Sequence, residues 1–196
     1  TIRWSHPQEL DFSIFTGPYQ YRLYQSQGLS GSYTPIFTTA SQASLFDCDT
    51  FFIQNNLNTE SQFYYYRVAL VNNGTELGTS TSGSTIFLTL VPNDNQLELV
   101  WNENVPWVNT GYEIWKEMPT GSGNFTLLAT TTVQNYIDSN LLNETTYCYK
   151  VRSIGGYSLP GIQNPLLNWS NVSCAKPTDL TPPCPPDLGN LIQDCE

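Results

Sequence analysis

The residue types that carry most enzymatic chemistry are scarce in this chain. A serine or cysteine nucleophile needs a base to take its proton, usually histidine, and the only histidine is His6, close to the first residue. The chain has no Gly-x-Ser-x-Gly turn, phosphate-binding glycine loop or dinucleotide-binding glycine pattern. The 17 Asp and Glu residues include enough carboxylates for a glycosidase, but they fall in expected loops and on outward strand positions. We therefore expect no enzyme and no cofactor.

Metal ligands are also thinly spread. Cysteine-zinc sites usually contain cysteines two to four residues apart, and no two of the five cysteines are that close. Oxygen ligands for calcium could come from Asp47 and Asp49, or from Asn93, Asp94 and Asn95 in the expected hinge between two domains. Turn formation is the commoner role of such residues. We predict no metal site, with calcium as the alternative.

Aromatic side chains are the remaining candidates for a binding site. Sugar-binding β-sandwiches stack their ligands on exposed rings, and four rings fall in expected loops or on outward strand positions: Trp107, Trp115, Tyr157 and Trp169. The alternative is that these rings cover the outer face of a sheet or seal a junction between domains. Clustering in one exposed patch would favour sugar binding.

Composition limits the fold and the partners. The net charge is −10, and the seven Lys and Arg residues are scattered from Arg3 to Lys176. Nucleic acids and anionic membranes require a basic face, so neither is an expected partner. No apolar run approaches the roughly 18 residues that span a bilayer. Few charged residues, with 13 Gly and 13 Pro, favour short strands and tight turns over long helices.

Strand-like segments of the second half have counterparts in the first half. Residues 99–101 match 2–4, residues 112–115 match 21–24, and residues 147–151 match 64–68, in the same order. Inward positions alternate with outward ones in these segments, which is the period of a half-buried strand. The sequence therefore predicts an internal repeat of two β-sandwiches.

These segments resemble the fibronectin type III module, an immunoglobulin-like β-sandwich. In that family an inward Leu precedes a Tyr whose hydroxyl bonds to the upstream backbone, the tyrosine corner. The resemblance gives this role to Tyr147 after Leu141, and to Tyr64 after Leu57, where the spacing is one residue longer. It implies an all-β chain with one module at 1–87, which lacks its N-terminal strand, and a second at 88–180. Residues 181–196 would form a Pro-rich linker and the start of a third module.

A narrower resemblance points to the cell surface. The chain is similar to tandem modules of large surface proteins of gliding-type bacteria, which carry a gliding-motility-associated C-terminal domain. Matching parts include Gly17, Pro18 and Tyr19, then residues 105–107, and the Pro-rich residues 182–186. The resemblance implies a secreted or surface protein that serves spacing, cell adhesion or protein contacts, with further modules on both sides and a protein or glycan ligand. A carbohydrate-binding module is the alternative.

The five cysteines favour an oxidising compartment. Cys148 and Cys174 fall on expected neighbouring strands of one sheet, so we predict a disulfide between them. We predict a second disulfide between Cys184 and Cys195, at the start of the third module. Cys48 is left as a free thiol, with an intermolecular bridge as the alternative. Its neighbours Asp47 and Asp49 are expected to raise its pKa.

Overall fold

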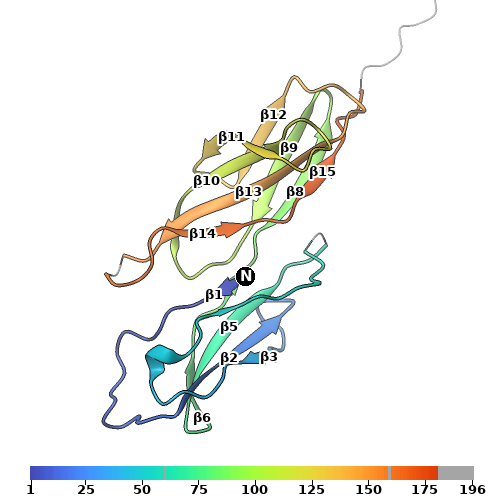
Figure 1. Ribbon diagram of the computed structural model, residues 1–196. Helices are drawn as coiled ribbons and strands as arrows, with labels where there is room; N and C mark the ends of the chain where they lie inside the picture. The colour runs from blue at the N-terminus through green and yellow to red at the C-terminus, as the bar shows by residue number, and fades with distance from the viewer. Residues whose placement is uncertain (60, 159, 181–196) are drawn as a thin grey trace, which may run out of the picture.

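The computed structural model describes residues 1–59, 61–158 and 160–180. Within these ranges the chain forms strands and one short 3-10 helix, arranged as two β-sandwiches that follow one another end to end (Figure 1). The predicted all-β fold with two consecutive sandwiches is confirmed. The predicted disulfide between Cys184 and Cys195 and the start of a third module lie outside the described residues.

The first sandwich has one large sheet and one small one. The large sheet has the order β3-β2-β5-β6, and β7 also pairs with β5. Its strands are β2 (Tyr19–Ser26), β3 (Thr34–Thr38), β5 (Tyr65–Asn72), β6 (Thr75–Thr79) and β7 (Gly83–Ser84). The small sheet pairs β1 (Ile2–Arg3) with β4 (Phe51–Phe52), and the 3-10 helix η1 (Leu45–Asp47) precedes β4.

The second sandwich has the same large sheet and a more complete small one. The large sheet has the order β11-β10-β13-β14, and β15 also pairs with β13. Its strands are β10 (Val108–Glu117), β11 (Phe125–Thr131), β13 (Tyr147–Gly156), β14 (Leu166–Trp169) and β15 (Ser173–Ala175). The small sheet has the order β12-β9-β8, from β8 (Phe87–Asn93), β9 (Gln96–Asn102) and β12 (Asn135–Ser139). Both sandwiches are antiparallel and immunoglobulin-like.

The alternating residues of the sequence supply the two cores. In the second sandwich one continuous cluster surrounds Trp101 and Tyr149, both fully buried, and the Trp101 ring meets the Tyr112 ring edge-on at 5.2 Å between centroids. Each such side chain contributes about 1.5–3 kcal/mol when it is removed from water. In the first sandwich the buried residues divide into two smaller clusters, around Tyr21 and around Leu23. The first core is therefore the thinner of the two.

Tight turns connect the strands where Asn and Gly tolerate left-handed backbone. Asn73 and Gly74, with φ of 48° and 81°, form the turn between β5 and β6. Asn95, with φ of 53°, forms the turn between β8 and β9. The prediction that Asn93, Asp94 and Asn95 form the hinge between domains is wrong, because these residues lie within the second sandwich. Short Asn-rich turns look alike in a hairpin and in a linker.

Candidate functional site

The two sandwiches meet without a linker. The N–H of Thr85 donates to the carbonyl of Tyr64 in the first sandwich, at 3.0 Å. The next residue, Ile86, is 1% exposed and belongs to the core of the second sandwich. Ile86 also forms an isolated parallel bridge with Ser170. The chain therefore passes from the first sandwich to the second between two adjacent residues.

Hydrogen bonds from Ser84 reinforce this joint. The N–H of Ser84 donates to the carbonyl of Asn104, and the Ser84 Oγ accepts from the N–H of Asn104, both at 2.7 Å. The side-chain amide of Asn168 donates to the carbonyl of Ser84 at 3.2 Å. Ser84 belongs to β7 of the first sandwich, whereas Asn104 and Asn168 belong to the second. These contacts restrict rotation of one sandwich against the other.

Glu103 is a partly buried acid beside the joint. Its carboxylate accepts hydrogen bonds from Asn109 at 2.6 Å, from Ser153 at 3.2 Å and from Asn168 at 3.4 Å. Burial raises the pKa of Glu103 above its ordinary value, although the hydrogen bonds that Ser153 and Asn168 donate act in the opposite direction. Because Asn168 also bonds to Ser84, Glu103 helps to hold the side chain that crosses the joint.

Trp107 and Tyr157, two of the four predicted ligand-stacking rings, lie together at the joint. Their ring centroids are 6.2 Å apart and their planes meet at 70°. The Trp107 indole donates to the side-chain oxygen of Asn109 at 3.0 Å. Gly155 permits this packing, because a Cβ there would come within 2.7 Å of the Trp107 ring. Both rings line a cleft between the two sandwiches.

Trp115 and Trp169, the other two predicted rings, form a separate cluster on the outer face of the large sheet. Their centroids are 5.7 Å apart. The guanidinium of Arg152 lies over both rings, 5.5 Å from Trp115 and 5.0 Å from Trp169. Lys150 lies 4.7 Å from the Trp169 ring centroid. Glu113 accepts from the Arg152 Nε at 2.8 Å and from the Trp115 indole at 3.0 Å.

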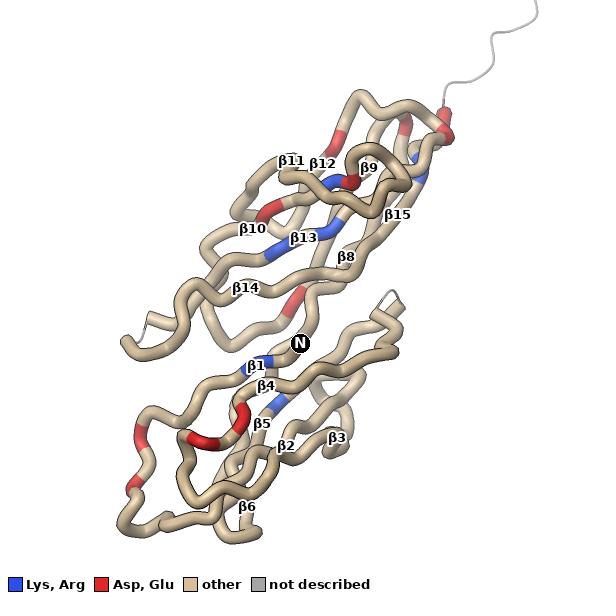
Figure 2. Tube along the Cα trace, viewed as in Figure 1, with Lys and Arg blue, Asp and Glu red and all other residues tan. Residues whose placement is uncertain are grey.

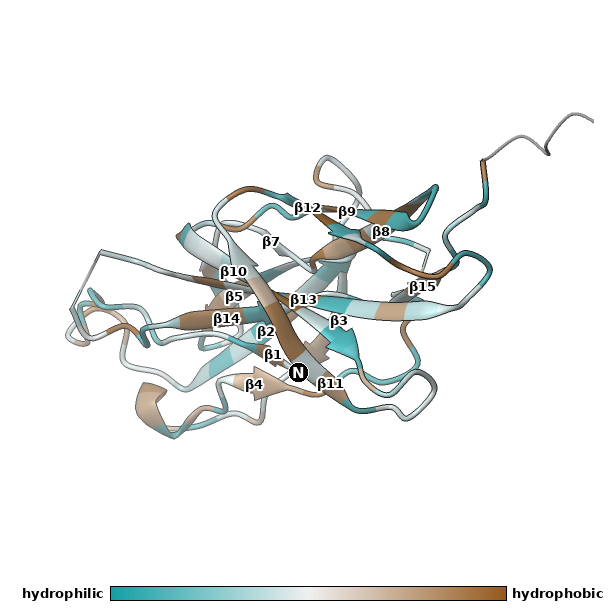
Figure 3. Ribbon diagram, turned by 90° about the horizontal axis from the view of Figure 1, so that it is seen from above, coloured by the Kyte–Doolittle hydropathy of each residue, from teal (hydrophilic) through white to brown (hydrophobic). Residues whose placement is uncertain are grey.

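This packing uses ring surface that a sugar would need. Cation–π contacts of this kind contribute about 0.5–2 kcal/mol each, more where water is excluded. A sugar stacked on Trp115 or Trp169 competes with Arg152 for the face that the guanidinium covers. Trp169 nevertheless keeps 40% of its surface exposed. Leu127 on β11 and Leu167 on β14 are also exposed, and both strands carry apolar (brown) segments in Figure 3.

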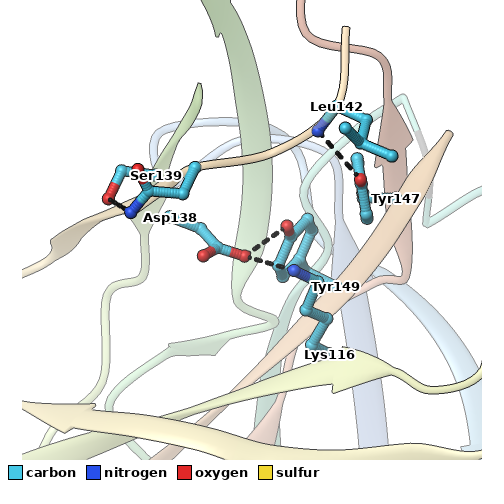
Figure 4. Close-up of polar contacts among 7 residues, drawn as sticks. Lys116, Asp138, Ser139, Leu142, Tyr147 and Tyr149 are labelled. Atoms are coloured by element: carbon cyan, nitrogen blue, oxygen red, sulfur yellow. Dashed lines mark hydrogen bonds and ion pairs between the residues drawn. The ribbon is translucent and has the colours of Figure 1, made fainter. Parts of the chain in front are cut away.

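A polar contact joins the two sheets of the second sandwich (Figure 4). The carboxylate of Asp138 on β12 accepts from the Lys116 ammonium at 2.8 Å and from the Tyr149 hydroxyl at 2.6 Å. Burial, and then the hydrogen bond to Asp138, raise the pKa of Tyr149. The Lys116 ammonium also lies 4.6 Å from the Tyr147 ring centroid. This contact, from which solvent is largely excluded, thereby connects strands of the two opposite sheets.

Both residues predicted for tyrosine corners accept hydrogen bonds from the upstream backbone. The Tyr147 hydroxyl accepts from the N–H of Leu142 at 3.1 Å, as Figure 4 shows. The Tyr64 hydroxyl accepts from the N–H of Asn58 at 3.2 Å. Each contact fixes the crossover between the two sheets of its sandwich.

Cysteines and metal ligands have clear positions among the described residues. Cys148 on β13 and Cys174 on β15 are paired residues of neighbouring strands and form a disulfide. Cys48 is buried, and burial followed by the charges of Asp47 and Asp49 raises its pKa. Within the described ranges no group of three or more His, Cys, Asp or Glu side chains is placed to hold a metal. No helix in these ranges is long and apolar enough to cross a membrane.

The prediction that the acids lie in loops and on outward, solvated strand positions is wrong for two residues. Glu117 and Asp138 are each 8% exposed. The Glu117 carboxylate accepts from the N–H groups of Gly121 at 2.9 Å and Gly123 at 2.6 Å, which fixes the turn between β10 and β11. The partners of Glu117 lie in a turn and those of Asp138 lie on other strands. Alternation along a single strand therefore could not identify these two acids as buried. Glu103 was missed as well, although it follows directly after the buried strand β9.

Comparison with known proteins gives structural likenesses only. No family model matches the chain, and no curated protein matches it. The FN1–FN3 domains of chicken CNTN1 are 9% identical, with a TM-score of 0.36 over 83% of this chain and 55% of that one. The chain thus spans about half the length of that solved chain.

Two further structures are similar at comparable levels. FN3tt is 26% identical over 43% of this chain and 85% of that one, with a TM-score of 0.29. The chicken interferon gamma receptor alpha chain is 12% identical over 90% of this chain and 91% of that one, with a TM-score of 0.33. The strand order remains the basis for the fold. The described chain is an all-β protein of two consecutive immunoglobulin-like sandwiches of the fibronectin type III kind.

Proposed function

We propose that this chain is a non-catalytic structural segment of a secreted or cell-surface protein, which holds neighbouring modules at a fixed spacing and orientation. The observation that carries the proposal is the joint between Thr85 and Ile86, where adjacent residues belong to different sandwiches. A flexible linker would let two modules sample many orientations. A joint of this kind suits a protein whose role is to set distance.

Three further features support the proposal. Ser84 forms hydrogen bonds with Asn104 and Asn168 across the joint, and the Asn168 side chain also donates to the Glu103 carboxylate. The Cys148–Cys174 disulfide suits an oxidising compartment. Adhesion through a protein partner would use the loops and sheet faces that such a segment displays. Attachment to a bacterial outer surface, with further modules on both sides, is part of the same proposal and rests on the sequence resemblance.

Carbohydrate binding is the second candidate, because the structure brings Trp115 and Trp169 together in one partly exposed cluster. Arg152 and Lys150 lie over these rings and cover ring surface that a sugar would need, which argues against carbohydrate binding. A glycan array with the chain and a Trp115→Ala/Trp169→Ala variant separates the two functions. We expect no binding that depends on these rings. Specific binding that the variant loses would establish the carbohydrate-binding function in place of spacing alone.

The spacing role itself is tested by small-angle X-ray scattering. The 196-residue chain would be compared with a variant carrying Gly-Ser-Gly-Ser between Thr85 and Ile86. We expect one narrow distribution of distances between the two sandwiches in the unaltered chain and a broad one in the variant. A matched insertion between Thr132 and Val133, in the exposed turn between β11 and β12, lengthens the chain equally and should leave the distribution narrow. Equally broad distributions in all three proteins would overturn the proposal.

A further inference from the structure

Strand β11 is an open edge of the second sandwich. It stands at one end of the large sheet, and among the described strands it pairs with β10 alone. Its middle residues, Thr126 to Leu128, are all exposed. The side chains of Leu127 and Leu128 keep 51% and 37% of their surface in solvent. An edge strand of this kind offers its free backbone groups to another strand.

The free backbone groups of β11 belong to Phe125 and Leu127. The N–H of Met118 donates to the carbonyl of Asn124 at 2.8 Å, so the backbone of Asn124 faces β10. Bonded and non-bonded positions alternate along an antiparallel strand. The N–H and carbonyl groups of Phe125 and Leu127 therefore point away from β10.

The other long edge strands carry residues that hinder pairing with a further strand. Proline lacks the N–H that a new partner needs, and a charge at an edge must lose water when a second strand approaches. Each of the other described edge strands of five or more residues has one of these: Pro35 in β3, Glu76 in β6, Pro92 in β8 and Asp138 in β12. Strand β11 has neither, and residues 118–137 include no charged side chain.

The comparison with β3 is the closest, because β3 is the counterpart of β11 in the first sandwich. Each strand contains one extra residue that bulges out of the register, Ile36 in β3 and Leu128 in β11. A bulge bends a strand and limits further pairing, but this device is common to both. Pro35 is present only in β3. The first sandwich thus closes an edge that the second leaves open.

We propose that β11 is a contact between two copies of this chain, in which the two β11 strands pair antiparallel about a two-fold axis at Thr126. Phe125 of each copy then lies opposite Leu127 of the other. These are the two residues whose backbone groups point outward, so each opposed pair exchanges two hydrogen bonds. The large sheets of the two copies would form one continuous sheet.

The side chains fit the same pairing. The Lys150 ammonium lies 4.5 Å from the centroid of the Phe125 ring, which places that ring on the outer face of the large sheet. Leu127 pairs with Trp115, whose ring lies on the same face. Phe125 and Leu127 of opposite copies would therefore meet on one face as a cross-strand apolar pair.

Charge favours a second copy of the chain at this edge. Each copy has a net charge of −10, so most approaches between two copies bring like charges together. The uncharged residues 118–137 are a part of the surface where two copies can meet without opposed charges. Two identical strands also satisfy each other symmetrically, as in most homodimers.

The contact would be weak and reversible. The bulge at Leu128 restricts the pairing to a few residues, whereas stable interfaces bury about 1,200–2,000 Å². We expect a dissociation constant of about 1 mM or somewhat tighter, so that pairing occurs where copies are crowded. The inference is independent of the proposed function, because the joint can be stiff whether or not β11 pairs.

Sedimentation and hydrogen exchange test the proposal on the 196-residue chain. The amides of Phe125 and Leu127 should exchange at least about twofold more slowly at 1 mM chain than at 0.01 mM, because about half of the copies or more are paired at the higher concentration. The Thr126 amide faces β10 and is the internal reference, which should change less. Association should increase from about 0.01 M to 0.15 M salt, as repulsion between the copies is screened.

Two variants and a matched control locate the contact. Leu127→Glu places an acid in the pairing and should weaken the dimer at least about tenfold. Leu167→Glu adds the same charge to β14 at a leucine with 50% exposure, close to the 51% of Leu127, and should leave the dimer unchanged except for the added repulsion. Leu127→Pro removes an N–H that β10 does not use, so it should also weaken the dimer. Near-ultraviolet circular dichroism checks that each variant is folded.

Three results would overturn the proposal. The first is a chain that stays monomeric at about 1 mM and 0.15 M salt. The second is a dimer in which the Phe125 and Leu127 amides exchange as fast as in the monomer. The third is a dimer that Leu127→Glu and Leu167→Glu weaken equally, which would place the contact between copies on another surface.

Discussion

The Asp138 carboxylate and the Lys116 ammonium lie 2.8 Å apart and connect the two sheets of the second sandwich. Asp138 belongs to β12 in the small sheet, and Lys116 belongs to β10 in the large one. Only 11% and 13% of these side chains are exposed, so solvent screens the pair weakly. The hydroxyl of Tyr149, also from the large sheet, shares the same carboxylate oxygen.

Removing one member of this contact should be costly. Asp138→Ala leaves the Lys116 ammonium buried without its partner, and the expected loss is about 3–5 kcal/mol of unfolding free energy. Urea denaturation would measure it. The double variant Asp138→Ala/Lys116→Met removes both charges, so we expect it to lose clearly less than the sum of the two single variants. Additive losses would show that the two charges do not interact.

Glu103 should make stability depend on pH. Since burial raises its pKa, the folded chain holds this proton more tightly than the unfolded chain does. Its contribution is therefore full below the ordinary carboxyl pKa and is lost as pH rises through the higher folded value. Glu103→Gln keeps an acceptor without a titrating proton. We expect the variant to be at least as stable at neutral pH and to show a flatter melting-temperature profile from about pH 4 to pH 8.

The control for Glu103 is Glu9→Gln, which changes an exposed acid of the first sandwich. Its pH profile should match that of the unaltered chain. A Glu103→Gln profile as steep as that of the unaltered chain would contradict the expected role of Glu103.

The Ser84 hydroxyl should determine how tightly the joint closes. Ser84→Ala removes the acceptor for the Asn104 N–H, and the loss of one partly buried hydrogen bond costs about 0.5–1.5 kcal/mol. We expect faster amide exchange at Asn104 and a broader scattering-derived distance distribution. Thr79→Ala, at an exposed position of β6, is the control and should change neither measurement.

Arg152 should stabilise the Trp115–Trp169 cluster through its flat guanidinium. Arg152→Ala loses the ion pair with Glu113 and both ring contacts, and we expect about 1–2 kcal/mol of destabilisation with a red shift of tryptophan emission. Arg152→Lys keeps the charge but not the planar stack, so it should recover only part of the loss. Arg22→Ala, which breaks the more exposed pair with Glu76, is the control and should cost less. An equal cost would mean that the rings add nothing.

The fold was predictable because alternation is a local property of the sequence. Leu97, Leu99 and Trp101 occupy every second position, and all three are fully buried on β9. The matched order of such segments was enough to predict two sandwiches. The sequence places the module boundary at residues 87 and 88, but nothing in residues 84–86 indicates that the two sandwiches meet without a linker.

The positions of the cations over Trp115 and Trp169 depend on the register between neighbouring strands, which the sequence alone does not give. Trp169 pairs with Arg152 across β13 and β14, and Trp115 pairs with Lys150 across β10 and β13. A shift of one residue in either pairing would send a ring or its cation to the opposite face. The rings could therefore be named as exposed candidates, but their cation partners could not.

Cations are few in this chain, and most are already engaged with its own rings. Arg3, Arg67, Lys116, Lys150 and Arg152 lie over aromatic rings, and Arg22 is paired with Glu76, out of seven Lys and Arg residues in all. Figure 2 shows how sparse the blue positions are, with two of them along β13.

Because each copy of the chain has a net charge of −10, neighbouring copies repel one another. The range of that repulsion falls from about 30 Å at 0.01 M salt to about 8 Å at 0.15 M. In a dense layer of such segments, the spacing between neighbouring copies would be wide at low salt concentration and would decrease as the salt concentration rises.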